Sequence, residues 1–418
     1  MNSADIQIGT CFDLTVERPA LGGDVIGTAP DGRIVFLRGA APGDVVSAKV
    51  TAVKKKFLRA EVLQVTPGPD RSEPFCSSFG ECGGCPWQSI PQETQRHAID
   101  NTISRSILRL AQPDVEVAPT WFDDRSDWRS TTRLRWNGAQ VGYFASGSHR
   151  LVDIEICPIL APPLPRMLST VRRELIGVDG QGTVRLTAEH GEDSGTVSIE
   201  LESVESYQDT SKALRRLVLE PEVHGATLRC LGRPTVSMGE PTNRLGSEQV
   251  PHPATAFVQA HQTGSRALVI DVMDHLKGAR HVLELYAGSG NFTFALAGRD
   301  VRVTAVEVDK AAIGRMKREA SSRKLEHLVT PVSAPAHKAP PGEYDSVLLD
   351  PPRAGAKEAL PMIHRTGANR IVYVSCDPAT LARDLRWLVE NGWGIAYVRA
   401  YDLFPHSGHA EAVAVCRR

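Results

Sequence analysis

The sequence lacks any apolar run long enough to cross a bilayer, which would take about 20 mostly apolar residues. Its first ten residues, MNSADIQIGT, also lack the basic segment and the apolar segment that a secretory signal combines. These absences exclude the common membrane and secreted classes. We therefore expect a cytoplasmic monomer with no membrane partner.

The net charge is also close to zero, and cysteines are few. The formal net charge is only −1, so any site for a polyanion must come from local clustering of basic side chains. Eight cysteines in 418 residues are too few for a disulfide scaffold. In a reducing compartment such cysteines are typically buried, metal-binding or catalytic.

Short β-strand patterns fill residues 10–65, in CFDLTVER, GRIVFLRG, DVVSAKVTAV and FLRAEVLQV. Glycine and proline separate them, and several strands at this spacing predict a small barrel over residues 1–66. The basic run KKKF, from Lys54 to Phe57, lies between two of these strands. It is either a solvated turn or a loop that contacts RNA phosphates.

A central α+β domain is predicted over residues 67–250, after the linker TPGPDRSEP. Strands are expected in WRSTTRLRW, AQVGYF and HRLVDIEI, where Arg129, Arg133 and Arg135 would share one face, toward either RNA or solvent. Four apolar residues at helical spacing predict a helix over residues 92–110: Ile99, Ile103, Ile107 and Leu110.

Four cysteines of this domain have a spacing typical of a metal centre: Cys76, Cys82, Cys85 and Cys157. The two glycines of CGGC allow the loop to wrap a metal. Four thiolates suit zinc or an iron–sulfur cluster, and the spacing does not choose between them. The alternative is a redox-active Cys-x-x-Cys pair.

Strand and helix patterns alternate from about residue 255 onward, which predicts a doubly wound α/β sheet over residues 251–418. ELYAGSG follows an apolar strand and precedes a helix start, and Glu307 ends the next strand. A glycine turn with a carboxylate at this distance favours a nucleoside-bearing cofactor over an unliganded turn. The ExxxGxG form resembles class I S-adenosylmethionine methyltransferases more than NAD enzymes.

"VSCDPATLARDL" places Cys376 directly before a predicted helix that Asp377 caps. An isolated cysteine is usually inert and buried, but a helix N-terminus is expected to lower the pKa of its thiol. Asp350-Pro-Pro-Arg353 ends a neighbouring strand at the same edge. A thiolate beside a methyl donor suits C5 methylation of uracil, which also requires a base. FPHSGHAEAVAV offers His406, His409 and Glu411, although Glu411 could also be a solvated strand residue.

Together these motifs resemble the RNA 5-methyluridine methyltransferase family, particularly its iron–sulfur bacterial members that modify 23S ribosomal RNA. The resemblance covers nearly the whole chain. It implies that the barrel is an RNA-binding TRAM domain and that the four cysteines hold a [4Fe-4S] cluster. It also implies structured RNA as the partner.

The resemblance further implies roles for individual residues. Cys376 would be the nucleophile and Glu411 the base. S-adenosyl-L-methionine would contact six residues: Gln259, Tyr286, Gly288, Asn291, Glu307 and Asp350. The chain departs from the family pattern in AFVQAHQ, where His261 replaces an asparagine, and in SCDP, where the charge of Asp377 would oppose a thiolate.

The sequence therefore predicts S-adenosylmethionine-dependent C5-methylation of a uridine in 23S rRNA through a covalent cysteine–C6 adduct. The same chemistry on tRNA is one alternative. A non-catalytic RNA-binding protein is another, and an N-methyltransferase is a third. Methyltransferases that act on exocyclic amines carry an aromatic residue at the position of Arg353, so Arg353 argues against an N-methyltransferase.

Overall fold

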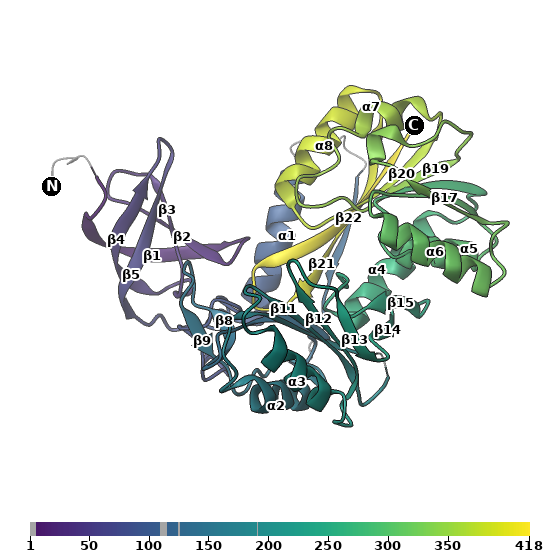
Figure 1. Ribbon diagram of the computed structural model, residues 1–418. Coiled ribbons are helices and arrows are strands. Elements are labelled where there is room, and N and C mark those ends of the chain that lie inside the picture. Colours follow the sequence, from purple (N-terminus) through teal and green to yellow (C-terminus); the bar gives the residue numbers. More distant parts are fainter. Residues whose placement is uncertain (1–5, 109–114, 124–125, 190) are drawn as a thin grey trace. The chain divides into compact units, whose positions relative to one another are not determined.

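The computed structural model describes residues 6–108, 115–123, 126–189 and 191–418 (Figure 1). The chain forms two compact units. The first contains Met1–Arg105, Tyr143–Val152 and Phe404–Ala410, and the second contains Ser106–Gly142, Asp153–Leu403 and Glu411–Arg418. Among the described residues, no helix combines the length and the apolar character that a membrane span requires.

The first unit contains a closed five-stranded barrel with the order β1-β2-β3-β5-β4, which confirms the predicted barrel. Along β1 and β4 buried residues alternate with outward ones, and Val35, Leu37, Val46 and Leu58 fill the interior at 1% exposure or less. The barrel strands are β1 (Cys11–Ala20), β2 (Asp24–Thr28), β3 (Ile34–Leu37), β4 (Val45–Val53) and β5 (Phe57–Thr66).

The predicted helix after the cysteine-rich segment is α1 (Gln92–Leu108). Ile99, Ile103 and Ile107 are buried along one stripe, as their spacing predicts. Leu110, the fourth residue of that pattern, lies outside the described residues.

A seven-stranded sheet has the order β13-β12-β11-β10-β7-β8-β9. In the second unit, α2 (Leu164–Leu175) and α3 (Tyr207–Leu217) bury their leucines against it. The strands are β7 (Thr131–Trp136), β8 (Val141–Phe144), β9 (Leu151–Asp153), β10 (Gly182–Ala188), β11 (Gly195–Leu201), β12 (Val223–Cys230) and β13 (Val236–Gly239). The hairpin β14 (Thr242–Leu245) and β15 (Val250–Pro253) follows.

An eight-stranded sheet forms the core of the second unit, with the order β18-β17-β16-β19-β20-β22-β21-β6. This order confirms the predicted doubly wound sheet and adds β6 at its edge. The strands are β6 (Glu116–Trp121), β16 (His281–Leu285), β17 (Arg302–Glu307), β18 (Val329–Ser333), β19 (Ser346–Leu349), β20 (Arg370–Ser375), β21 (Gly394–Phe404) and β22 (His409–Arg417).

The registers of β16, β17, β19 and β20 bring their carboxyl ends to one edge of this sheet. Leu285 pairs with both Val306 and Leu349, and Leu349 pairs with Tyr373. Helices connect the strands, as right-handed crossovers in parallel sheets require. They are α4 (Gln262–His275), α5 (Asn291–Ala297), α6 (Lys310–Ser322), the short 3-10 helix η1 (Ala336–Lys338), α7 (Leu360–Arg365) and α8 (Pro378–Glu390).

Asp384 of α8 clamps the loop that follows β19. Its carboxylate is 1% exposed and accepts hydrogen bonds from the Tyr373 hydroxyl at 2.8 Å and the Ala356 backbone N–H at 2.7 Å. Arg383 donates to the same carboxylate and to the Ala354 carbonyl, each at 2.8 Å. Gly355 has φ +78°, and a Cβ there would lie 2.6 Å from the Asp384 carboxylate. The loop is thereby fixed to the helix that begins beside Cys376.

Replacing Asp384 by alanine leaves the Ala356 N–H and the Tyr373 hydroxyl without their buried acceptor. We expect Asp384→Ala to lower the free energy of unfolding by about 3 kcal/mol, measured by urea denaturation followed through tryptophan fluorescence. Asp274→Ala, at an exposed position on α4, is the control and should stay within about 0.5 kcal/mol of the parent. Equal stability of the two variants would contradict the clamp.

Candidate active site

The glycine turn after β16 is built on three left-handed backbone positions. Tyr286 has φ +62°, Gly288 has φ +55° and Gly290 has φ +96°. A Cβ at Gly290 would lie 2.9 Å from the Phe294 ring, so only glycine fits this turn. Glu284, 2% exposed on β16, accepts a hydrogen bond from the Thr293 hydroxyl at 2.6 Å and ties α5 to the strand.

Glu307, at the end of β17, faces this turn. One of its carboxylate oxygens accepts the Gly288 N–H at 3.0 Å, and the other accepts the Asp309 N–H at 2.9 Å. A carboxylate has about four acceptor positions, so both oxygens can accept further hydrogen bonds from a ligand. The carboxylate is therefore held in place and still able to bind hydroxyl groups.

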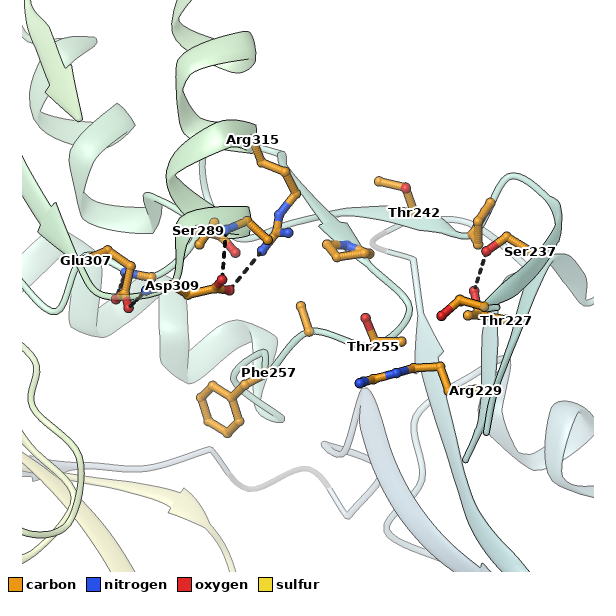
Figure 2. A pocket seen from close by; sticks show the side chains of 17 residues that line it. Thr227, Arg229, Ser237, Thr242, Thr255, Phe257, Ser289, Glu307, Asp309 and Arg315 are labelled. Atoms are coloured by element: carbon orange, nitrogen blue, oxygen red, sulfur yellow. Dashed lines mark hydrogen bonds and ion pairs between the residues drawn. The ribbon is translucent and has the colours of Figure 1, made fainter. Parts of the chain in front are cut away.

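A cavity of about 760 Å³ opens at the turn (Figure 2). Gly288, Ser289 and Glu307 line one side, and Thr227 and Arg229 of β12 line another. Of the sequence-predicted cofactor residues, the lining includes Gly288 and Glu307. Gln259, Tyr286, Asn291 and Asp350 lie outside it.

Two of those outlying residues carry unmatched acceptors. Among the described residues, the buried amide oxygens of Gln259 and Asn291 have no hydrogen-bond partner. Buried polar atoms in native proteins nearly always find partners, so acceptors without one point to a missing ligand or water.

Cys376 follows β20 directly, and the helix cap predicted for Asp377 is confirmed. One oxygen of the Asp377 carboxylate accepts the Ala379 N–H at 2.9 Å and the Thr380 N–H at 2.8 Å. The Cys376 thiol is partly buried at the start of α8.

Glu411 lies on β22, the last strand of the chain, which pairs with the strand that precedes Cys376. β22 runs antiparallel to β20, with Ser375 opposite Ala412, so the next pair in that register is Cys376 and Glu411. Asp350 is one residue beyond the Leu349–Tyr373 pair of β19 and β20. The structure thus brings the sequence-predicted nucleophile and base together beside Asp350.

The expectation of an acidified thiol is wrong. Burial raises the pKa of Cys376 to about 11, and the charges of Glu411 and Asp350 raise it further than Arg353 lowers it. The helix N-terminus is outweighed by these effects. The carboxylates that oppose the thiolate are Glu411 and Asp350, and Asp377 is not among them.

The same edge raises the pKa values of its carboxyl groups. Burial, with the charge of Asp350, raises the pKa of Glu411 to about 8, against the lowering effects of a hydrogen bond from Gln259 and the charge of Arg353. Burial raises the pKa of Asp350 to about 7. Arg353 is the cation that favours the ionised forms of both Cys376 and Glu411, a role that sequence reasoning missed.

The cysteines of the predicted metal centre are distributed over both units. Cys76, Cys82 and Cys85 belong to the first and Cys157 to the second, and all four are partly buried. Within the described residues, no three histidine, cysteine or acidic side chains group closely enough to hold a metal ion. The Cys82 segment is ordered by the Gly83 N–H, which donates to the Phe144 carbonyl at 3.0 Å.

Two family models match the chain. The TRAM domain model matches residues 6–63, and the model of tRNA (uracil-5-)-methyltransferases matches residues 251–329 and 342–418. In fold, the chain is similar to a Pyrococcus abyssi tRNA (uracil-54, C5)-methyltransferase solved with S-adenosyl-L-homocysteine. The TM-score is 0.75 at 22% identity, over 96% of this chain and 99% of that one.

Curated relatives match over nearly the full length. The chain is 32% identical to the 23S rRNA (uracil(1939)-C(5))-methyltransferase RlmD of Chromohalobacter salexigens, over 98% of this chain and 90% of the relative. It is 31% identical to the protein of the same name from Shewanella halifaxensis, over 92% and 91%. An uncharacterized RNA methyltransferase of Thermotoga maritima is 30% identical, over 95% and 96%. With this identity and coverage, and with both family models, the chain belongs to the TRAM-containing RNA uracil-C5 methyltransferase family.

Proposed function

We propose that this protein methylates C5 of a uridine in 23S rRNA, with Cys376 as the nucleophile and Glu411 as the base. One observation supports the proposal: the register of β20 and β22 ends at the Ser375–Ala412 pair, so Cys376 and Glu411 come next in it, and the charges of Glu411 and Asp350 both act on the Cys376 thiol. Uracil C5 methylation requires a nucleophile for C6 and a base for the C5 proton. This edge of the sheet supplies both.

Each bond change on the uracil ring can be assigned. The Cys376 sulfur, as thiolate, bonds to uracil C6, and the electrons of the C5–C6 double bond move toward C5. C5 would then bond the methyl group as the bond between that group and the donor's sulfonium sulfur breaks. Glu411 removes the C5 proton, the double bond re-forms, and the bond between sulfur and C6 breaks to return the thiolate. Uridine must leave its base stack to reach both groups.

The cofactor residues fit S-adenosyl-L-methionine. We assign Glu307 and Gly288 to the ribose side, and Gln259, Tyr286, Asn291 and Asp350 to the remaining contacts. The unmatched acceptors of Gln259 and Asn291 support a ligand with hydrogen-bond donors. When bound, S-adenosyl-L-methionine supplies a methyl group from a sulfonium cation, whose charge favours ionised carboxylates nearby.

The choice of RNA follows sequence identity, which is 32% and 31% to the two RlmD proteins and 22% to the protein of the solved structure. The names of the two RlmD relatives give 23S rRNA as their substrate. The name of the protein in the similar solved structure gives tRNA. We therefore put 23S rRNA first and tRNA second. This substrate implies a cytoplasmic site of action, and we propose a monomer with the TRAM barrel at residues 1–66, a central domain at 67–250 and the methyltransferase domain at 251–418.

We also propose that the four cysteines hold a [4Fe-4S] cluster: Cys76, Cys82, Cys85 and Cys157. The donor set supports it, because the four cysteines are partly buried and the Cys-x-x-Cys segment carries two glycines. Zinc is the second candidate for the same four thiolates. We assign the cluster a structural role.

The function is tested by transfer of labelled methyl groups to unmodified 23S rRNA and, in parallel, to unmodified tRNA. We expect 5-methyluridine at one position of 23S rRNA. Cys376→Ala should lower the rate at least about 1000-fold, because no thiolate can add to C6. Glu411→Gln should allow the attack and methylation but retain the C5 proton, so a denaturant-resistant protein–RNA adduct should accumulate.

Cys11→Ala is the matched control, because Cys11 is an exposed cysteine of the barrel. It should methylate as fast as the parent. Label in tRNA alone would replace the proposed substrate, and label in neither RNA would reject the enzyme. Undiminished methylation by Cys376→Ala would reject the mechanism.

The raised pKa values predict a pH dependence. Glu411 must lose its proton before it can accept one from C5, and its pKa is about 8. The pKa of Cys376, about 11, is also above neutrality. Both ionised forms are lost as pH falls, so kcat/KM should rise steadily from pH 6 to pH 9 by at least about tenfold. A flat or falling profile in a constant-ionic-strength buffer series would contradict these pKa values.

The cluster is tested by anaerobic purification with iron, sulfide and zinc analysis. We expect about four iron and four sulfide per chain, with loss of most of the iron in Cys82→Ser. Cys230→Ser, at a cysteine outside the set, should retain it. Bound zinc without iron would assign the four thiolates to a zinc site.

A further inference from the structure

One face of the seven-stranded sheet in the second unit carries a row of arginines. Arg133 on β7, Arg185 on β10 and Arg229 on β12 point away from the face that α2 and α3 cover, because their neighbours Leu134, Val184, Leu186 and Leu228 are fully buried. We call these three residues the arginine face.

Two of these arginines oppose each other directly. Arg185 pairs with Arg133 across β10 and β7, and like charges in directly opposite positions destabilise a sheet. Burial and the charge of Arg133 lower the pKa of Arg185. The fold therefore maintains an unfavourable contact that it could have avoided with a neutral residue.

Internal carboxylates compensate the arginine face only in part. Glu200 of β11 contacts Arg133 at 3.3 Å and Arg229 at 3.1 Å, and its charge also favours the charged form of Arg185, so one carboxylate serves three arginines. Within the part of the chain that the structure describes, Arg185 makes no ion pair. The face therefore has more positive than negative charge, and an external anion would stabilise it.

The arginine face continues into the cavity at the glycine turn. Arg229 lines that cavity together with Thr227 and Ser237 from the same sheet, and Gly288 and Glu307 line it from the methyltransferase sheet. Figure 2 shows Arg229 and the two hydroxyl residues on the side of the cavity away from Glu307. A polyanion on this face would therefore end beside the cofactor turn.

We propose that the arginine face binds the phosphate backbone of the substrate RNA and directs it to the cavity. The inference rests on the proposed function and assigns it a surface in the central region. The sequence had offered one of its three residues, Arg133, as part of a face toward either RNA or solvent. Three gaps between neighbouring strands separate β7 from β12, a span of roughly 14 Å. Such a row fits successive phosphates of one chain better than a single small anion. Guanidinium groups bind phosphate bidentately.

The test measures binding of an unmodified 23S rRNA fragment to the full-length protein by fluorescence anisotropy at several salt concentrations. We expect Arg185→Gln and Arg229→Gln each to weaken binding roughly tenfold. Each should also reduce the slope of log K against log salt by about one. Affinity for S-adenosylmethionine, measured by calorimetry, should stay unchanged in Arg185→Gln, because Arg185 does not line the cavity. Arg215→Gln is the matched control, an exposed arginine of α3 on the covered side of the sheet.

Thermal unfolding separates this role from a structural one. Arg185→Gln removes the repulsion with Arg133, so its melting temperature should equal or exceed that of the parent, whereas a structural arginine would lower it. Unchanged RNA affinity in both variants, with a parent that methylates RNA, would overturn the arginine face and leave the proposed function standing. A parent that neither binds nor methylates RNA would overturn both. Polyglutamate bound as tightly as RNA, with the same dependence on Arg185, would assign the face to an acidic protein instead.

Discussion

The antiparallel pairing of β22 with β20 is the constraint on which the active site depends. The neighbours of β20 on its other side are parallel, and their carboxyl ends bring Asp350 and the glycine turn to one edge. Only a strand that runs the opposite way can begin at this edge and present its first residues there. β22 does so, and its register sets Glu411 opposite Cys376. A slip of one residue would turn Glu411 to the other face of the sheet.

This arrangement has an electrostatic consequence. Three acidic groups, Cys376, Glu411 and Asp350, share an edge where burial disfavours their ionised forms. The charge of Asp350 further raises the pKa of Glu411, and the charges of both carboxylates further raise the pKa of Cys376. The pKa values of Cys376, Glu411 and Asp350, about 11, 8 and 7, all lie above the usual values of these groups. Arg353 offsets part of this cost. The positive charge of a methyl donor at the same edge would favour the ionised forms further, so binding of the donor and ionisation of Cys376 would be coupled.

Much of the fold could be predicted because it depends on patterns among residues close together in the sequence. Strand alternation indicated the barrel, the strand–helix alternation indicated the doubly wound sheet, and Asp377 caps α8 as its position before Pro378 suggests. The pKa of Cys376 could not be predicted in this way. The helix N-terminus is a local feature, whereas burial and the charges of Asp350 and Glu411 depend on residues remote in sequence. Asp384 and Arg185 were missed for the same reason, since their significance lies in partners on other elements.

The central claim is that Cys376 forms a transient bond to uracil C6 that proton removal by Glu411 releases. An RNA fragment with 5-fluorouridine at the target position tests it directly, because a base cannot remove fluorine as it removes a proton. With S-adenosylmethionine present, we predict a stable complex in which mass spectrometry finds one methylated fluorouridine attached to the peptide that contains Cys376. Attachment to another residue would contradict the account, as would the absence of an adduct while ordinary RNA is methylated.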